Sequence, residues 1–217
     1  MIPGMIGGHA APAPVLTYLG SASNSSNGAF FSFTGKTFGA AAPDRRIIVA
    51  YVLTRAGTFG VSATTIGGVS TSSSVAETSS DGNRVRVGII HAAVPTGTSG
   101  DINLLADQVC EYCAVAWFSV TGLDATAASD TASDDHGDPL SAAIDVLAGG
   151  FAIGVAASNT STGWTWSGLD EVVDVAPEGG DRFGVAWREF PGGVSGQTVT
   201  ADPTSDAVEC MAIAAWR

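Results

Sequence analysis

The sequence has very little positive charge. Lysine occurs once among 217 residues, as Lys36, and the formal net charge is −12. Charged residues of both signs make up only 14% of the chain. Because an acidic surface repels phosphate backbones and anionic lipids, we expect neither a nucleic acid nor a membrane as a partner.

Long hydrophobic runs and cysteines are also scarce. No apolar run reaches the roughly 18 residues that a membrane-spanning helix needs. No lysine or arginine precedes Lys36, so the basic segment of a secretory signal peptide is absent. Three cysteines are too few for a disulfide scaffold, and we expect reduced thiols.

Two of the cysteines, Cys110 and Cys113, have the CxxC spacing of a zinc half-site or a redox pair. A zinc site would need a second pair, which the sequence does not contain. The surrounding residues are typical of a strand, in which positions i and i+3 face opposite sides. We therefore interpret this spacing as a coincidence.

Catalytic signatures are missing as well. The chain contains no GxSxG, HExxH or GxxxxGK[ST] motif. Nucleophilic catalysis usually needs a histidine base, and only His9, His91 and His136 are present. We expect no enzyme and no cofactor. A glycan-cleaving enzyme built from two distant carboxylates stays open as an alternative, because such pairs leave no local motif.

Glycine is abundant, at 28 positions, and is accompanied by many alanine, serine and threonine residues. The clearest runs of strand length and composition cover residues 45–55, 84–94, 112–120, 150–158, 181–190 and 207–216. Turn segments such as NSSNG, SSDGN and PEGGD separate the strands. This pattern predicts an all-β, single-domain antiparallel β-sandwich over residues 15–217, with a jelly roll as its commonest version at this length.

The run at residues 84–94, RVRVGIIHAAV, begins with alternating arginine and valine and becomes apolar on both faces. A strand that is covered on both sides can pack against a second subunit, which would indicate a homo-oligomer. The alternative is a central strand that other parts of the same chain cover.

The segment DTASDDHGD concentrates acidic residues in a chain that is otherwise poor in charge. Its four carboxylates belong to Asp130, Asp134, Asp135 and Asp138. The spacing lacks the alternate ligand positions and the final glutamate of an EF-hand loop. We predict a solvated connection whose side chains bind their own backbone, and a Ca²⁺ site is the alternative.

Two tryptophans, Trp164 and Trp166, lie on one side of a short segment that is rich in polar residues. Exposed indoles in this arrangement could form a platform for sugar rings. Alternatively, the pair closes one end of the core, since large aromatic side chains usually bury most of their area.

The first 14 residues form an arm whose prolines and glycines oppose both helix and central strand. Its apolar side chains are Met1, Ile2, Met5 and Ile6. Because a solvated tail rarely carries such residues, we predict an extended arm that contacts another chain.

Arginines occur in two close pairs, Arg45 with Arg46 and Arg84 with Arg86. In a chain of net charge −12, these pairs are the natural partners for acidic neighbours. We therefore predict that they contribute to assembly contacts that weaken as ionic strength rises.

The order of motifs resembles that of small structural proteins encoded by tailed bacteriophages and prophages, particularly those of alphaproteobacteria. The resemblance rests on RRIIVAYVLTR, VSATTIGGVS, RVRVGIIHAAVPTGTSGDINL, AVAWFSVTGL, DTASDD and IDVLAGGFAIGVAAS with a WTW segment. These are strand and turn signatures spread over residues 15–217. The resemblance implies a β-sandwich component of the virion that is made in the host cytoplasm.

We therefore expect a non-enzymatic virion protein, specifically a decoration or cement protein on the exterior of a phage head. Its partners would be the major capsid protein or other virion proteins, together with further copies of itself. The alternative is a glycan-binding receptor module of a tail or head fibre. Copy number in the particle separates the two hypotheses.

Overall fold

The computed structural model describes residues 12–55, 57, 59–80, 84–160, 162–177, 181–204 and 208–217. These residues form antiparallel strands and no helix, which confirms the predicted all-β fold. Most of the N-terminal arm, including Met1, Ile2, Met5 and Ile6, lies outside the described residues, so its predicted contacts stay a prediction.

The strands divide into an N-terminal and a C-terminal half. The N-terminal half contains β1 (Val15–Asn24), β2 (Gly28–Thr37), β3 (Arg46–Thr54), β4 (Val61–Ile66), β5 (Val69–Ser70), β6 (Ser72–Thr78), β7 (Val85–Ala93), β8 (Ser99–Cys110) and β9 (Tyr112–Thr121). The C-terminal half contains β10 (Asp130–Asp134), β11 (Leu140–Val146), β12 (Gly150–Ser158), β13 (Thr165–Ser167), β14 (Asp170–Val175), β15 (Arg182–Phe190), β16 (Val194–Asp202) and β17 (Glu209–Trp216).

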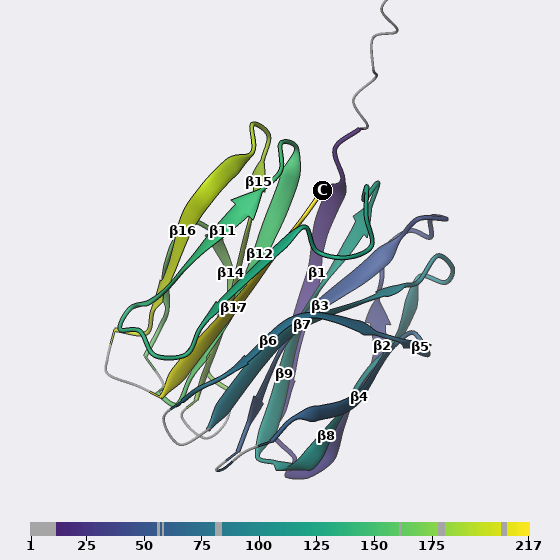
Figure 1. Ribbon diagram of the computed structural model, residues 1–217. Coiled ribbons are helices and arrows are strands. Elements are labelled where there is room, and N and C mark those ends of the chain that lie inside the picture. Colours follow the sequence, from purple (N-terminus) through teal and green to yellow (C-terminus); the bar gives the residue numbers. More distant parts are fainter. Residues whose placement is uncertain are drawn as a thin grey trace, which may run out of the picture.

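Each half is a sandwich of an inner and an outer sheet. The inner N sheet has the order β1-β9-β3-β7-β6, and the outer N sheet has the order β2-β8-β4-β5. The inner C sheet has the order β10-β17-β12-β15-β14, and the outer C sheet has the order β11-β16-β13. Figure 1 shows the N-terminal half in purple to teal beside the C-terminal half in green to yellow.

Three cores hold these four layers together. The N core lies between the two N sheets, the C core between the two C sheets, and a central core joins the two inner sheets. Strand β3 serves two of them, because Ile47 and Val49 face the N core while Ile48 and Ala50 face the central core. The central strands of the inner sheets, such as β3, are therefore apolar on both faces.

Strand β7 follows the same rule. Its residue Ile89 belongs to the central core and Ile90 to the N core. The apolar run at 84–94 is thus covered by other parts of the same chain, as the second of the two interpretations proposed. One chain is therefore enough to explain why this run is apolar on both faces. The homo-oligomer stays a prediction, which rests on the expected contact of the N-terminal arm with another chain.

The two halves have the same topology. When the strands of each half are numbered one to eight, with the two-residue β5 left out, both inner sheets have the order 1-8-3-6-5 and both outer sheets have the order 2-7-4. A jelly roll would place strand five beside strand four in the outer sheet, whereas here it pairs with strand six. The predicted sandwich is therefore present twice, and the complete jelly-roll order is not reproduced.

Arg45 fastens the connections around the start of β3. Its side chain is buried, and its guanidinium donates hydrogen bonds to six backbone carbonyl oxygens at 2.7 to 3.3 Å. The acceptors belong to Phe38, Gly39, Ala40, Val94, Thr96 and Gly97. Every donor of this arginine serves the fold, so the prediction that Arg45 faces an acidic neighbour is wrong.

Candidate functional site

The two halves differ on one flank, and the tryptophan pair fills that flank in the C-terminal half. Trp164 is 6% exposed and covers Gly184 of β15, where an added Cβ would come within 2.5 Å of the indole. Trp166 covers Gly154 of β12, and the two ring centroids are 6.3 Å apart. Both side chains join the C core, so the arrangement corresponds to a pair that closes the core rather than to an exposed sugar platform.

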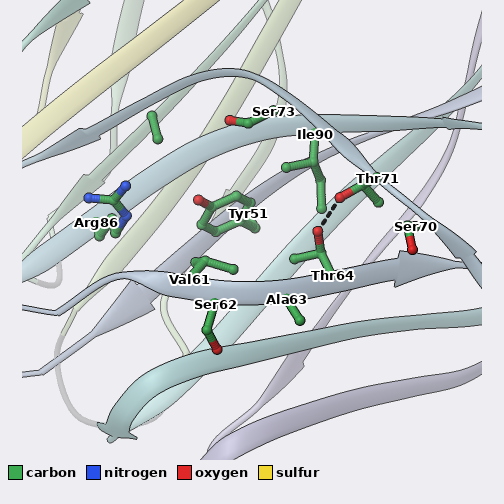
Figure 2. Close-up of a pocket in the computed structure, with 11 residues that line it drawn as sticks. Tyr51, Val61, Ser62, Ala63, Thr64, Ser70, Thr71, Ser73, Arg86 and Ile90 are labelled. Carbon is green, nitrogen blue, oxygen red and sulfur yellow. Dashed lines mark hydrogen bonds between the residues drawn. The ribbon is translucent and has the colours of Figure 1, made fainter.

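The N-terminal half has a cavity on the corresponding flank. Strand β4 takes the position in the topology that β13 takes in the C-terminal half. Residues 61–64 of β4, Val-Ser-Ala-Thr, contain no aromatic side chain, whereas β13 contains Trp166 and directly follows Trp164. A cavity of about 490 Å³ opens between β4 and the pair β6 and β7. Its lining consists of Tyr51, Val61, Ser62, Ala63, Thr64, Ser70, Thr71, Ser73, Ala76, Arg86 and Ile90. Figure 2 shows Val61 and Thr64 directed from β4 toward Tyr51 and Ile90, whereas Ser62 and Ala63 are directed away from them.

Tyr51 forms the inner wall of the cavity. It projects from β3 across Gly88 of β7, where an added Cβ would lie 2.5 Å from the phenol oxygen. A glycine at this position is therefore required for the ring to lie flat on the neighbouring strand. Burial raises the pKa of Tyr51, while the charge of Arg86 and a hydrogen bond to it act in the opposite direction. The phenol stays protonated and is available as a donor.

Arg86 supplies the positive charge of the cavity. Its Nη1 donates to Thr78 Oγ1 at 2.6 Å, and its Nε is buried without a hydrogen-bond partner. Among the described residues, no carboxylate lies within salt-bridge distance of this guanidinium. An unpaired arginine is unusual in a chain with 21 acidic residues, and it makes the cavity attractive to an anion.

Hydroxyl groups line the rim of the cavity. They belong to Ser62, Thr64, Ser70, Thr71 and Ser73. The hydroxyls of Thr64 and Thr71 hydrogen-bond to each other where β4 approaches the start of β6 (Figure 2). Val61, Ala63 and Ile90 add apolar wall between these polar groups. The arrangement can bind a polar, hydroxylated ligand, and its lining contains no pair of acid and base side chains.

The aspartate segment has a different role from the one its composition indicated. Residues 130–134 form strand β10, which pairs with β17, so the prediction of a solvated loop is wrong for this part. The Asp134 carboxylate accepts hydrogen bonds from the backbone N–H groups of His136 and Ser141. The Asp130 carboxylate accepts one from the N–H of Asp145 at 2.7 Å. These two carboxylates stabilise the connection from β10 in the inner C sheet to β11 in the outer C sheet.

The remaining aspartates, Asp135 and Asp138, lie in the turn after β10. Within the described part of the chain, no three histidine, cysteine or acidic side chains are close enough to hold a metal ion together. The structure therefore adds nothing in favour of the Ca²⁺ alternative.

A second cavity, of about 320 Å³, is lined by Ser72, Ser73, Ser74 and His91 among others. The His91 ring meets Trp216 edge-on. Its Nδ1 is 3.1 Å from Nη1 of Arg46, so this ring nitrogen accepts and the imidazole is neutral. Burial, and secondarily the charge of Arg46, lower the pKa of His91. With its Nδ1 held by a cation instead of a carboxylate, this histidine lacks the partner that orients a catalytic base.

The sequence predicts that the CxxC cysteines share one strand. In the structure they lie on two successive strands. Cys110 ends β8, Cys113 lies in β9, and both are buried in the N core as free thiols. Burial raises the pKa of Cys110 to about 11, so its thiol is protonated at neutral pH and unreactive.

Comparisons with known proteins do not assign the chain to a family. No family model matches it, and no curated protein matches its sequence. The described residues also contain no helix of the length and hydrophobicity needed to cross a membrane.

Proposed function

We propose that the protein is a non-enzymatic component of a tailed-phage virion, namely a decoration or cement protein on the head exterior. The supporting observation is an apolar patch on the outward face of the outer N sheet. Phe30 is 58% exposed, Leu105 is 39% exposed and Val109 is 60% exposed. Phe30 and Leu105 are cross-strand partners, so their side chains are neighbours on β2 and β8.

The opposite end of the four-layer body is polar. The outward face of the outer C sheet exposes Ser141, Asp145, Thr165, Ser195 and Thr198. A protein that coats a shell needs one face that binds the shell and one that meets solvent. The stacking of two sandwiches places these faces on the first and the last layer, which suits this role.

The patch gives a direct test on reassembled particles. Phe30→Ser should weaken attachment about tenfold or more, because burying a phenylalanine side chain contributes about 1.5 to 3 kcal/mol. Occupancy is measured by gel densitometry after purification of the particles, and hundreds of copies per particle are expected for the wild type. Val175→Ser, which changes an exposed valine of β14, is the matched control.

The melting temperature of Phe30→Ser should match that of the wild type, since the side chain is exposed. Wild-type occupancy of the variant would refute docking through this patch. A handful of copies per particle would instead support a tail or head-fibre module.

That second candidate, a glycan-binding receptor module, is favoured by the hydroxyl-lined cavity. The tryptophan pair no longer supports it, because Trp164 is part of the C core. A glycan-binding site on this protein would involve the N-terminal half, where Tyr51 and Arg86 face an open space.

A further inference from the structure

We propose that the cavity between β4 and the pair β6 and β7 binds a carboxylate-bearing sugar, a hexuronate unit, with its carboxylate on Arg86 and Tyr51 and its ring hydroxyls on the serine and threonine rim. The proposal deepens the glycan-binding candidate by naming the ligand class. It does not depend on where the protein sits in a particle.

Arg86 is the residue that we expect to bind the carboxylate of the sugar. A guanidinium forms its strongest hydrogen bonds with a carboxylate, often two at once. Thr78 engages one donor of Arg86 and the Tyr51 phenol oxygen engages another, while Nε is buried, so the remaining Nη hydrogens are the donors that a ligand in the cavity can reach. Beside it, Tyr51 offers a phenol hydroxyl from a side chain that is almost fully buried. Two donors thus converge on one end of the cavity, as a carboxylate requires.

The other residues that line the cavity have the chemistry to bind a sugar ring. Five serine and threonine hydroxyls alternate with the small apolar side chains of Val61, Ala63 and Ala76. The Ser62 hydroxyl donates to the Leu105 carbonyl, and those of Thr64 and Thr71 bond each other, so these oxygens serve a ring hydroxyl chiefly as acceptors. The hydroxyls of Ser70 and Ser73 can donate or accept. The apolar groups suit the C–H face of a pyranose. The volume of about 490 Å³ lies within the range of small-molecule sites.

Comparison of the two halves argues against a simple packing defect. The same topology closes this flank with Trp164 and Trp166 in the C-terminal half, so the fold is able to fill the space. A defect would expose apolar side chains, and such empty space is costly. The N-terminal cavity instead presents hydroxyls and a charge, which favour water or a polar ligand.

The test uses the full-length protein and three soluble probes: glucuronate, glucose and acetate. Chemical-shift perturbation in ¹H–¹⁵N spectra reports both the affinity and the place of binding. We expect saturable shifts with glucuronate at residues of β4, β6 and β7. Glucose lacks the carboxylate and acetate lacks the ring, so each should bind at least about tenfold more weakly.

Two variants locate the anchor. Arg86→Gln should weaken glucuronate binding about tenfold or more, and Tyr51→Phe should weaken it severalfold while keeping the ring on Gly88. Arg188→Gln is the matched control, because Arg188 is paired with Asp170 on the surface of the C-terminal half. Thermal melting verifies that each variant is folded, and Tyr51→Phe carries the test if Arg86→Gln is not.

Each alternative outcome would overturn a defined part of the proposal. The absence of saturable shifts with glucuronate would remove the site. Equal affinity for glucose and glucuronate would remove the anion anchor, and equal affinity for acetate would reduce the site to a carboxylate pocket. Neither of these results would alter the copy number or attachment of the protein on a particle, so the two proposals fail separately.

Discussion

At the scale of single residues, His91 shows how burial of one side chain couples stability to pH. Its pKa is lowered from the usual 6.5, first by burial and then by the charge of Arg46. The unfolded chain, which exposes this ring, therefore binds a proton at a higher pH than the folded chain does. Stability from the neutral ring is complete above pH 6.5 and is lost as the pH falls from there through the folded pKa.

We predict that the free energy of unfolding decreases as the pH is lowered from 7 through this window. His91→Gln, which cannot titrate, should show a smaller decrease over the same range. Urea denaturation at a series of pH values measures the slope. If the variant and the wild type have equal slopes, the acid sensitivity belongs to other groups and the buried imidazole does not cause it.

The sequence predicts part of the candidate binding site, which contains Arg86 and Tyr51, but not their contact. Arg86 alternates with Val85 and Val87, and this alternation correctly places it on the face opposite the central core. Tyr51 is the one residue with a polar group in the apolar run IIVAYVLT before its final threonine. The pattern alone cannot bring the two together, because their contact depends on the pairing of β3 with β7.

At the scale of elements, the short strand β13 and the residue before it supply two indoles, those of Trp166 and Trp164, to the C core. Trp164 covers Gly184 and Trp166 covers Gly154, so each ring fills the space left by a missing side chain. The structure thus gives this segment a packing role. Removal of either ring would leave a cavity between the two C sheets.

We predict that Trp164→Ala lowers the free energy of unfolding by about 3 to 5 kcal/mol, as large-to-small changes in a core do. Thr165→Ala, at the next position in the chain, which is exposed, should change it by no more than about 0.5 kcal/mol. Chemical denaturation of both variants provides the comparison. If Trp164→Ala has the same free energy of unfolding as the wild type, packing does not explain this tryptophan and a ligand-binding role becomes the better hypothesis.

The strands that could be predicted from the sequence share one property. The six clearest runs became β3, β7, β9, β12, β15 and β17, all of them in the inner sheets. The central strands of the inner sheets are buried on both faces over most of their length and therefore have strong apolar signals. Strand β10 was missed because it lies at a sheet edge and is made of aspartate, serine, threonine and alanine. Its regular structure comes from pairing with β17, which its own composition does not reveal.

At the scale of the whole molecule, the central core joins the two sandwiches into one body. Side chains such as Val87 on β7 and Ile153 on β12 contribute to it from opposite halves. Separating the halves would expose one complete apolar face of each inner sheet. The number of layers could not be predicted from the sequence, since a strand covered on both faces gives the same pattern whether its cover is a loop, a second sheet or another subunit.

We predict that the two halves unfold together. Native-state hydrogen exchange should give the same opening free energy for the most protected amides of β3 and of β12, and Ile153→Ala should lower both by an equal amount. An effect confined to the C-terminal half would show that the sandwiches are independent folding units.

Two copies of one architecture within a single body also bear on how a binding site can arise. Replacing large buried side chains at one side of a sandwich by small ones lowers its free energy of unfolding. A single sandwich domain has a small free energy of unfolding, so it tolerates few such changes. In this protein the C-terminal half keeps its tryptophan pair, and the central core stabilises both halves. The other repeat can therefore diverge in sequence and acquire a ligand, because the cost of its open flank is distributed over the entire chain.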